Sequence, residues 1–485
     1  MIDMLGTNQL KKAIFGFKIL YLIYLLLAFN SFVNAKGWMN LASYVITALG
    51  AVLILWMGVF YKRYRRVHNR FLLLAFVVSY CVSAAAHISY GLVENVKGLI
   101  WLLIPLIIVY ASAFDMSREE IRREMRWLSG IYILYCTVAN LVSLSMVYWG
   151  RMYEFQDKAG NFHVIGYRWN RLWGIYDDPN HGATITMIAL FMLLYFLADI
   201  KKIWKKVLLF LVFIINYIYI VLSDSRTGIV GLAAGLLCGG LFWVFVNRGA
   251  AGRKALVRVA GVVGFTLVLA AGTFGVKTLY QPIDEKIVVQ LNEKTKREAA
   301  EKNAQKNTAN STSKNTVGNT IKKEPNLREQ DITEDYSNGR LSIWKDGLEI
   351  VASSPIIGVG FRNIVPYTLE HFPDNYLVNN EQEGQYDSLH NLELDILVSQ
   401  GIVGILIFLA LFVNICVMIV RRAGRIRVED RKEGTLAFAA VASLGAAVTF
   451  LSFIFYVNAP QNFCFWLFLG YLMRICQLTE DEQTV

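Results

Sequence analysis

Charged residues are scarce in this chain of 485 residues, because only 18% are Asp, Glu, Lys or Arg while 55% are hydrophobic. A soluble chain has about a quarter of its residues charged. The deficit excludes an intrinsically disordered protein and a coiled coil. It also argues against a soluble DNA-binding protein, although the formal net charge is +11. No nucleic-acid partner is therefore expected.

Several motifs of common enzyme chemistry are missing as well. The six cysteines form no CxxC pair, which excludes a disulfide scaffold and favours buried apolar side chains. The sequence contains no P-loop motif, no dinucleotide-binding glycine motif, no HExxH and no GxSxG. No cofactor is expected from these observations.

Long apolar runs, by contrast, are abundant. A helix needs about 20 apolar residues to cross a bilayer, and about twelve runs approach this length. They predict an all-α integral membrane protein whose first span, preceded by Lys11 and Lys12, is an uncleaved helix. The predicted spans are 17–34, 41–61, 71–92, 98–114, 127–148, 182–198, 204–222, 227–246, 256–275, 394–420, 435–457 and 460–476.

The hydrophilic segments between the spans alternate in character. One set is short and basic, and the positive-inside rule assigns it to the cytoplasm together with both termini. The other set is poor in Lys and Arg near the membrane and is assigned to the outer face. The basic set comprises 62–70, 115–126, 199–206, 247–258 and 421–433.

This topology predicts five parts along the chain. The parts are 1–148 with spans one to five, an outer loop at 149–181, 182–275 with spans six to nine, a large outer loop at 276–390, and 391–485 with the last three spans and a cytoplasmic tail.

The large outer loop has two halves of different composition. Residues 292–325 are rich in Lys, Asn, Thr and Glu and lack aromatics, so we expect them to be disordered. Further on, Leu341, Trp344, Leu348 and Val351 recur at helical spacing and predict a helix that packs on neighbouring helices or the lipid interface.

The positive-inside rule places arginines on the cytoplasmic side, so it does not account for arginines on the predicted outer face. Each arginine there is therefore expected to have a specific partner. Arginines from separate loops can converge on one phosphate, because guanidinium binds it through two parallel hydrogen bonds. The alternative is that they snorkel to lipid phosphates or pair with Asp177, Asp224 or Glu393. The arginines concerned are Arg168, Arg171, Arg226 and Arg340.

His390 is the candidate general base, since an unperturbed imidazole titrates near neutrality. Asp387 or Glu393, each three residues away, could orient its ring. His181 and His163 are rivals.

The pair Asp177 and Asp178 raises the alternative of a metal site, but a helix-capping turn explains two adjacent carboxylates as well. No metal is therefore assigned.

Four segments occur in a fixed order on the predicted outer face. Together they resemble the O-antigen ligase and polysaccharide polymerase superfamily, over roughly residues 165–420. In that superfamily a Pro-Asn pair follows the fifth span and a Ser-Arg pair follows the seventh. A helix with the pattern Arg-x-x-x-Trp then ends in Pro-x-x-Gly-x-Gly, and a His-Asn pair precedes a Gly-rich span. The segments are RLWGIYDDPNHGA (171–183), SDSRTG (223–228), GRLSIWKDGLEIVASSPIIGVGFRN (339–363) and SLHNLELDILVSQGIVG (388–404).

The resemblance implies a membrane-embedded, inverting and metal-independent glycosyltransferase of the GT-C type. Such enzymes transfer a glycan from an undecaprenyl-diphosphate carrier to an acceptor hydroxyl outside the bacterial cytoplasmic membrane. Arg226 and Arg340 match the family arginines that hold the diphosphate, and His390 matches its loop histidine. Asn180, Asn391 and, more loosely, Arg171 match further polar positions. Arg168, Asp387 and His181 complete the expected substrate-binding set.

Three functions remain open at this stage. A polymerase would join lipid-linked repeat units, whereas a ligase would transfer the glycan to lipid A core or another terminal acceptor. The Lys- and Asn-rich stretch favours an AT-rich, Gram-positive source and hence a polymerase. A transporter or flippase is the alternative of another class, but the spans are nearly free of charged residues and show no repeat. Expected partners are the glycan donor and acceptor, membrane lipids, and flippase and chain-length regulator proteins.

Overall fold

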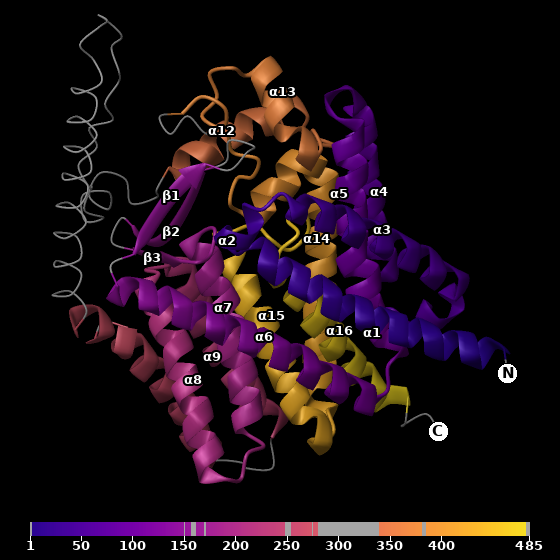
Figure 1. Ribbon diagram of the computed structural model, residues 1–485. Helices are drawn as coiled ribbons and strands as arrows, with labels where there is room; N and C mark the ends of the chain where they lie inside the picture. Colours follow the sequence, from indigo (N-terminus) through magenta and orange to yellow (C-terminus); the bar gives the residue numbers. More distant parts are fainter. Residues whose placement is uncertain are drawn as a thin grey trace, which may run out of the picture.

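The protein was analysed as a computed structural model, which describes residues 2–149, 151–156, 162–168, 171–247, 254–273, 275–279, 339–380 and 385–481. Over these residues the chain is mostly helical, with one small sheet (Figure 1). The stretch 292–325, which was expected to be disordered, lies outside the described residues, so that expectation stays a prediction.

The helices before the sheet form the N-terminal part of the molecule. The first begins earlier than the predicted span 17–34 and ends at Ala28, where the chain turns into a one-turn helix. These helices are α1 (Ile2–Ala28), α2 (Ser31–Asn34), α3 (Trp38–Val59), α4 (Arg70–Ala86), α5 (Leu92–Leu103), which continues into a π-helical stretch (Ile104–Tyr110), and α6 (Arg118–Tyr148).

The remaining helices follow the sheet. α7 lies in the core, because most of its residues are buried and it contacts α6, α8, α9 and α15. The helices are α7 (Pro179–Leu197), α8 (Ile203–Leu222), α9 (Arg226–Val246), α12 (Arg340–Ser353), α13 (Ile364–His371), α14 (Leu392–Arg422), α15 (Arg431–Ala447) and α16 (Pro460–Asp481), with a further apolar helical stretch over Lys254–Leu279.

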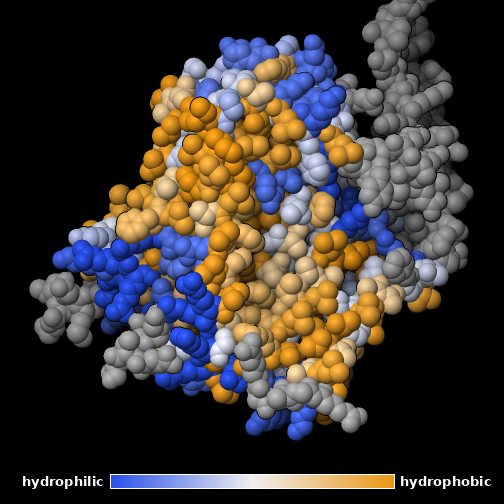
Figure 2. Space-filling model, turned by 180° about the vertical axis from the view of Figure 1, so that it is seen from behind, coloured by the Kyte–Doolittle hydropathy of each residue, from blue (hydrophilic) through white to orange (hydrophobic). Residues whose placement is uncertain are grey.

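Eight helices in the described part of the chain are long and apolar enough to cross a membrane. The protein is thus a multi-pass membrane protein, and a broad hydrophobic belt separates the hydrophilic ends of its surface (Figure 2). The predicted number of twelve spans is not confirmed. The other four predicted spans correspond to α1, α4, α15 and α16, and α4 is an apolar helix of only 17 residues.

The predicted span 435–457 is only partly helical. α15 ends at Ala447, and residues 448–459 continue without regular helix although most of them are buried. Hydropathy cannot distinguish an apolar helix from an apolar irregular segment, because both are equally hydrophobic. The irregular segment is stabilised by specific bonds, including one from the Trp466 indole to the Ile454 carbonyl (2.8 Å).

The predicted outer loop 149–181 contains a small sheet that the sequence analysis did not anticipate. Three antiparallel strands, β1 (Met152–Gln156), β2 (Phe162–Arg168) and β3 (Arg171–Gly174), lie in the order β1-β2-β3. Met152 pairs with Gly166 at one end of the sheet, and β3 leads through a short turn into α7. The sheet thereby fixes the direction from which the chain enters the core helix.

A kink in α14 joins this helix to the large outer loop. Gly401 has φ 63°, outside helical geometry, and the carbonyls of Val398 and Ser399 accept hydrogen bonds from Val359 and Gly360 (both 2.9 Å). Beyond the kink, the amide of Ile402 donates to the carbonyl of Pro355 (2.9 Å). Non-helical backbone at membrane depth requires such partners. The sequence PIIGVG (355–360) is thus the segment that pairs with the broken helix.

Close helix packing depends on glycine between α9 and α15. A Cβ on Gly231 or Gly239 would meet backbone or side-chain atoms of Ser443 and Ala439, so any larger residue would force the helices apart.

We predict that Gly358→Ala destabilises the protein by at least about 2 kcal/mol. Gly358 has φ 66°, and an added Cβ would collide with the backbone of α14 at Ser399 and Gln400. The measurement is the thermal unfolding midpoint in detergent. Gly445→Ala is the matched control, since Gly445 lies inside α15 with open space around it. Equal midpoints for the two variants would contradict this account of the kink.

Candidate functional site

Three of the predicted site residues lie where helices begin. Arg226 is the first residue of α9, Arg340 is the first residue of α12, and His390 lies two residues before α14. The structure brings them together, since Arg340 interacts electrostatically with both Arg226 and His390. Asp178, at the start of α7, interacts electrostatically with Arg340 and with His390. A cluster of cations, histidine and carboxylate therefore forms from segments far apart in the sequence.

The loop that carries His390 is held by the buried carboxylate of Asp395. Asp395 accepts hydrogen bonds from the Ser388 hydroxyl and from the Leu389 amide, both at 2.7 Å. The Ser388 oxygen in turn accepts the amide of His390 (3.1 Å). From the sequence, Asp387 or Glu393 was expected to orient the histidine, whereas Asp395 was not considered because it lies inside the predicted span 394–420.

Asn391 anchors the same loop on the other side. Its side-chain oxygen caps α14 by accepting the amide of Leu394 (2.9 Å), and its side-chain nitrogen donates to the Thr449 carbonyl (3.2 Å). The amide of Leu392 donates to Val448 (3.2 Å). Asn391, expected to bind substrate, thus positions the histidine loop against the irregular segment 448–459.

One face of α12 contacts the histidine loop. Arg340, Trp344 and Gly347 follow one another at helical spacing. The Trp344 indole donates to the Leu389 carbonyl (3.0 Å), and the absent side chain of Gly347 leaves room for the Leu389 side chain. The Arg340 guanidinium lies 6.0 Å from the centre of the Phe450 ring.

The predicted apolar stripe of this loop helix is correct only in part. Trp344 and Val351 are partly buried, but Leu341 and Leu348 are more than half exposed. The fully buried side of α12 consists of Ile343, Gly347 and Ile350 instead.

Two residues next to the site have left-handed backbone geometry that is uncommon outside glycine. His390 has φ 53° and Asp224, two residues before Arg226, has φ 49°. Such conformations persist only where surrounding contacts hold them, and they gather at functional sites. The hydrogen bonds of Asp395 to the loop hold the left-handed conformation of His390. An ion pair with Lys277 fixes the side chain of Asp224.

Arg171 and Asn180 connect the start of α7 to the start of α9. The Arg171 guanidinium donates to the Asn180 side-chain oxygen (2.8 Å) and to the Ser223 carbonyl (2.9 Å). The same Asn180 oxygen accepts the hydroxyl of Ser225, the residue that caps α9 (3.0 Å). Both residues were expected to bind substrate, and the structure places them as supports for the backbone that carries Arg226.

His181 lies beside the cluster in the first turn of α7. It interacts electrostatically with Asp178 and His390. Its ring packs on Phe29, and its Nδ1 lies 3.2 Å from the side-chain nitrogen (Nε2) of Gln461. The contact with Gln461 fixes the ring orientation.

Asp177 and Asp178 are already committed to the turn before α7. Asp178 accepts the amides of Asn180 (2.7 Å) and His181 (3.1 Å), and Asp177 accepts the amide of Asp178 (2.9 Å). Burial, with the nearby charge of Asp178, raises the pKa of the Asp177 carboxyl well above its usual range. The hydrogen bonds of both carboxylates to backbone amides of the turn favour the capping interpretation. Within the described ranges, no group of three or more His, Cys, Asp or Glu side chains is arranged to hold a metal ion.

Two predicted residues lie apart from the cluster. Arg168, in β2, forms an ion pair with Glu154 of β1 (2.7 Å), and His163 is buried in the same strand with its ring stacked on Phe155. Both interactions stabilise the small sheet.

The comparisons with known proteins bear on this cluster. The model of the O-antigen ligase family matches residues 209–409, which include Arg226, Arg340 and His390. Residues 209–409 form an O-antigen ligase family domain. The resemblance to the O-antigen ligase and polymerase superfamily is thus confirmed. A search of curated proteins found no match.

The O-antigen ligase domain implies glycosyltransferase-like activity, and the electrostatics of the cluster suit it. Burial, together with the charge of Arg340, lowers the pKa of His390 below its usual 6.5. Burial and the charge of Arg226 lower the pKa of Arg340, opposed by Asp178. Near neutral pH the site therefore offers an uncharged imidazole beside two guanidinium groups.

The contacts of Asp395 predict that Asp395→Asn lowers kcat on the order of tenfold or more. An amide must present its NH₂ group to either Ser388 or the Leu389 amide, so the loop loses one acceptor. KM for the glycan donor should change much less, because the arginines remain. Steady-state kinetics measure both. Glu393→Gln is the matched control, since Glu393 makes no hydrogen bond to this loop among the described residues, and an equal loss there would contradict the assignment.

The lowered pKa of His390 predicts an activity that rises with pH below 6.5 and is flat above it. A general base acts in its neutral form, so the acid limb follows this pKa. Asp387 raises the pKa of His390, so Asp387→Asn should move the limb to lower pH. The pH dependence of kcat/KM tests this, and Asp374→Asn is the control because Asp374 is an exposed carboxylate in the turn after α13. A limb that stays in place in Asp387→Asn, or lies above 6.5 in the unmodified protein, would contradict the role of His390.

Proposed function

We propose that this protein is a membrane glycosyltransferase that polymerises undecaprenyl-diphosphate-linked oligosaccharide repeat units on the outer face of the bacterial cytoplasmic membrane. The product would be a capsular, exopolysaccharide or O-antigen chain. The observation that carries the proposal is the convergence of Arg226, Arg340 and His390 within the O-antigen ligase domain.

The two arginines would bind the diphosphate of the donor. Both stand at the N-terminal end of a helix, where unpaired amides and the helix dipole also favour an anion. The diphosphate gains negative charge as the anomeric C–O bond breaks. Fixed cations aimed at that charge stabilise the transition state more than the ground state.

His390 would act on the acceptor. The acceptor oxygen attacks the anomeric carbon while its proton moves to the imidazole, and the electrons of the broken C–O bond leave with the lipid diphosphate. Attack on the face opposite the leaving group gives inversion and needs no metal ion. The left-handed backbone and the bonds to Asp395 would hold the ring ready for this transfer.

The expected layout follows from the same hypothesis. The active site would face outward and both termini the cytoplasm, in a GT-C-like arrangement of about twelve spans. The partners would be the lipid-linked donor, the glycan acceptor and membrane lipids, with flippase and chain-length regulator proteins nearby.

A ligase that transfers the finished glycan to lipid A core or another terminal acceptor is the second candidate, because it would use the same cluster. Only the Lys- and Asn-rich composition of 292–325 favours a polymerase.

A transporter is supported less well. The predicted spans are nearly free of charged residues, and the structure buries the few that lie within them or at their borders: Lys18 pairs with Glu124 (2.5 Å), and Asp395 lies in α14. Asp395 is engaged by the histidine loop, however, and Glu124 lies two turns from the start of α6. Neither forms a polar path across the bundle.

We predict that Arg226→Ala, Arg340→Ala and His390→Ala each abolish polymer formation without loss of protein from the membrane. The measurement is the glycan size distribution in a deletion strain complemented with each variant. Single repeat units on carrier or core would indicate a polymerase, whereas long chains on the carrier would indicate a ligase.

Arg151→Ala serves as the matched control, since Arg151 is an exposed arginine of the small outer loop. Long chains in all three site variants would refute the assignment of the cluster.

A further inference from the structure

A second site lies at the end of the helix bundle opposite the His390 cluster. A cavity of about 430 Å³ is bounded by α7, α9, α15 and the helical stretch Lys254–Leu279. α9 runs from Arg226 in the cluster to Val246 near the cavity, and α15 runs from Arg431 at the cavity back towards the histidine loop. The two sites therefore occupy opposite ends of the same helices.

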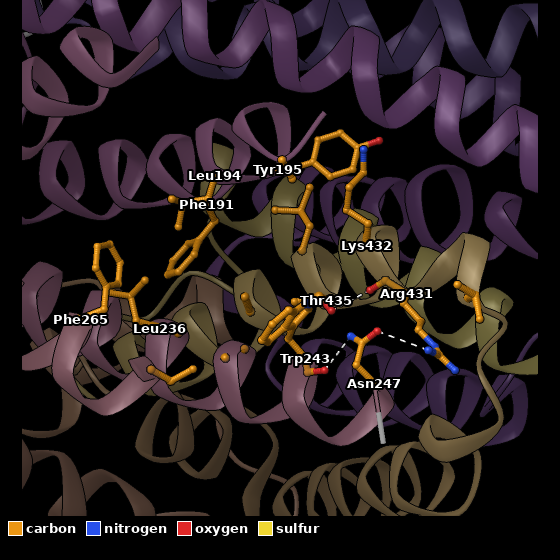
Figure 3. Close-up of a pocket in the computed structure, with 18 residues that line it drawn as sticks. Phe191, Leu194, Tyr195, Leu236, Trp243, Asn247, Phe265, Arg431, Lys432 and Thr435 are labelled. Carbon is orange, nitrogen blue, oxygen red and sulfur yellow. Dashed lines mark hydrogen bonds between the residues drawn. The ribbon is translucent and has the colours of Figure 1, made fainter. Parts of the chain in front are cut away.

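Small residues line part of this cavity. At Gly239 the backbone of α9 lies against Ala439 of α15, and Gly235 and Gly240 are in close contact with the side chains of Phe191 and Val262. The rest of the lining is largely apolar, including Phe191, Leu194, Leu236, Val262, Phe265 and Leu436 (Figure 3). The volume suits on the order of a dozen methylene groups, taking each as about the size of a water molecule.

One end of the cavity is basic and aromatic. Arg431 donates to the side chain of Asn247 (3.3 Å), and Lys432 lies 4.0 Å from the centre of the Tyr195 ring (Figure 3). Just outside, the guanidinium of Arg258 stacks on Trp243 at 5.5 Å and donates to the Asn247 carbonyl. Trp and Tyr prefer the level of the lipid head groups, where Lys and Arg meet phosphate.

Two of the three basic residues at this end form no ion pair with an acid among the described residues. Lys432 pairs with Asp199. The hydrogen bonds of Arg431 and Arg258 run to uncharged oxygens of Ile426 and Asn247, and neither guanidinium forms an ion pair within the described ranges. An anion can therefore be bound without displacing an existing ion pair.

We propose that this cavity binds an anionic phospholipid. One acyl chain would lie in the cavity between α7 and the helical stretch Lys254–Leu279, against the surface of α9, and the phosphate would lie between Arg431 and Arg258. On the expected topology this lipid belongs to the cytoplasmic leaflet, so it is neither donor nor acceptor of the proposed transfer. The inference rests on the cavity and its charge and does not depend on the proposed function.

The test uses the full-length protein in a neutral detergent, with phosphatidylglycerol or phosphatidylcholine added at equal concentrations. Phosphatidylglycerol should raise the thermal unfolding midpoint by several degrees, whereas phosphatidylcholine should not. Native mass spectrometry should detect bound phosphatidylglycerol. Arg431→Gln and Arg258→Gln should each weaken binding about fivefold, and Ala198→Trp, at the exposed C-terminus of α7, should obstruct the acyl chain.

The control is Arg427→Gln, because Arg427 is a nearby basic residue that does not line the cavity and interacts with Glu429. Equal stabilisation by both lipids would overturn the head-group assignment. Equal weakening by Arg427→Gln, unchanged binding in Ala198→Trp, or retention of an isoprenoid diphosphate in place of phospholipid would overturn the site. None of these outcomes depends on glycan synthesis, so the proposed function is tested separately.

Discussion

Buried backbone that is not helical must find hydrogen-bond partners inside the protein, and this constraint shapes the region around His390. A group left unpaired in hydrocarbon costs several kcal/mol. Three irregular segments, 355–360, 388–391 and 448–459, meet this requirement by bonding to one another and to α14. Val359 and Gly360 pair with the carbonyls freed at the Gly401 kink, and Leu392 pairs with Val448. The loop that carries the histidine is therefore part of a continuous bonded framework.

This framework explains why the supporting residues matter as much as the charged ones. Asp395, Trp344 and Asn391 hold the backbone on either side of His390. Arg171 and Asn180 do the same for the helix that begins with Arg226. Chemistry that depends on fixed charges requires such support, because a guanidinium that reorganises during the reaction stabilises its transition state less. The two left-handed residues, Asp224 and His390, show where the chain bends sharply to present these groups.

The basic residues of the protein serve two physical roles. Those in short segments between helices set the expected orientation in the membrane, and Arg431 with Arg258 also frames an apolar cavity. The arginines at the other end are the minority that the orientation signal does not explain, and two of them share the site with His390. The two ends are joined by α9 and α15, which pack closely at Gly231 and Gly239, and the cavity lies beside this contact.

The sequence by itself determined the class of the protein. Hydropathy predicts a multi-pass membrane protein, and the order of RLWGIYDDPNHGA, SDSRTG, the Arg-x-x-x-Trp helix and the His-Asn pair predicts the family, because such signals are local in the chain. Only the tertiary structure decided which polar residues face the site and which support it. Arg168 pairs across a sheet that hydropathy does not reveal, Asp395 is hidden within an apolar run, and the apolar segment 448–459 is irregular. These outcomes depend on how segments pair in three dimensions, as in the bond from Asn391 to Thr449, 58 residues away, and hydropathy carries no information about such pairing.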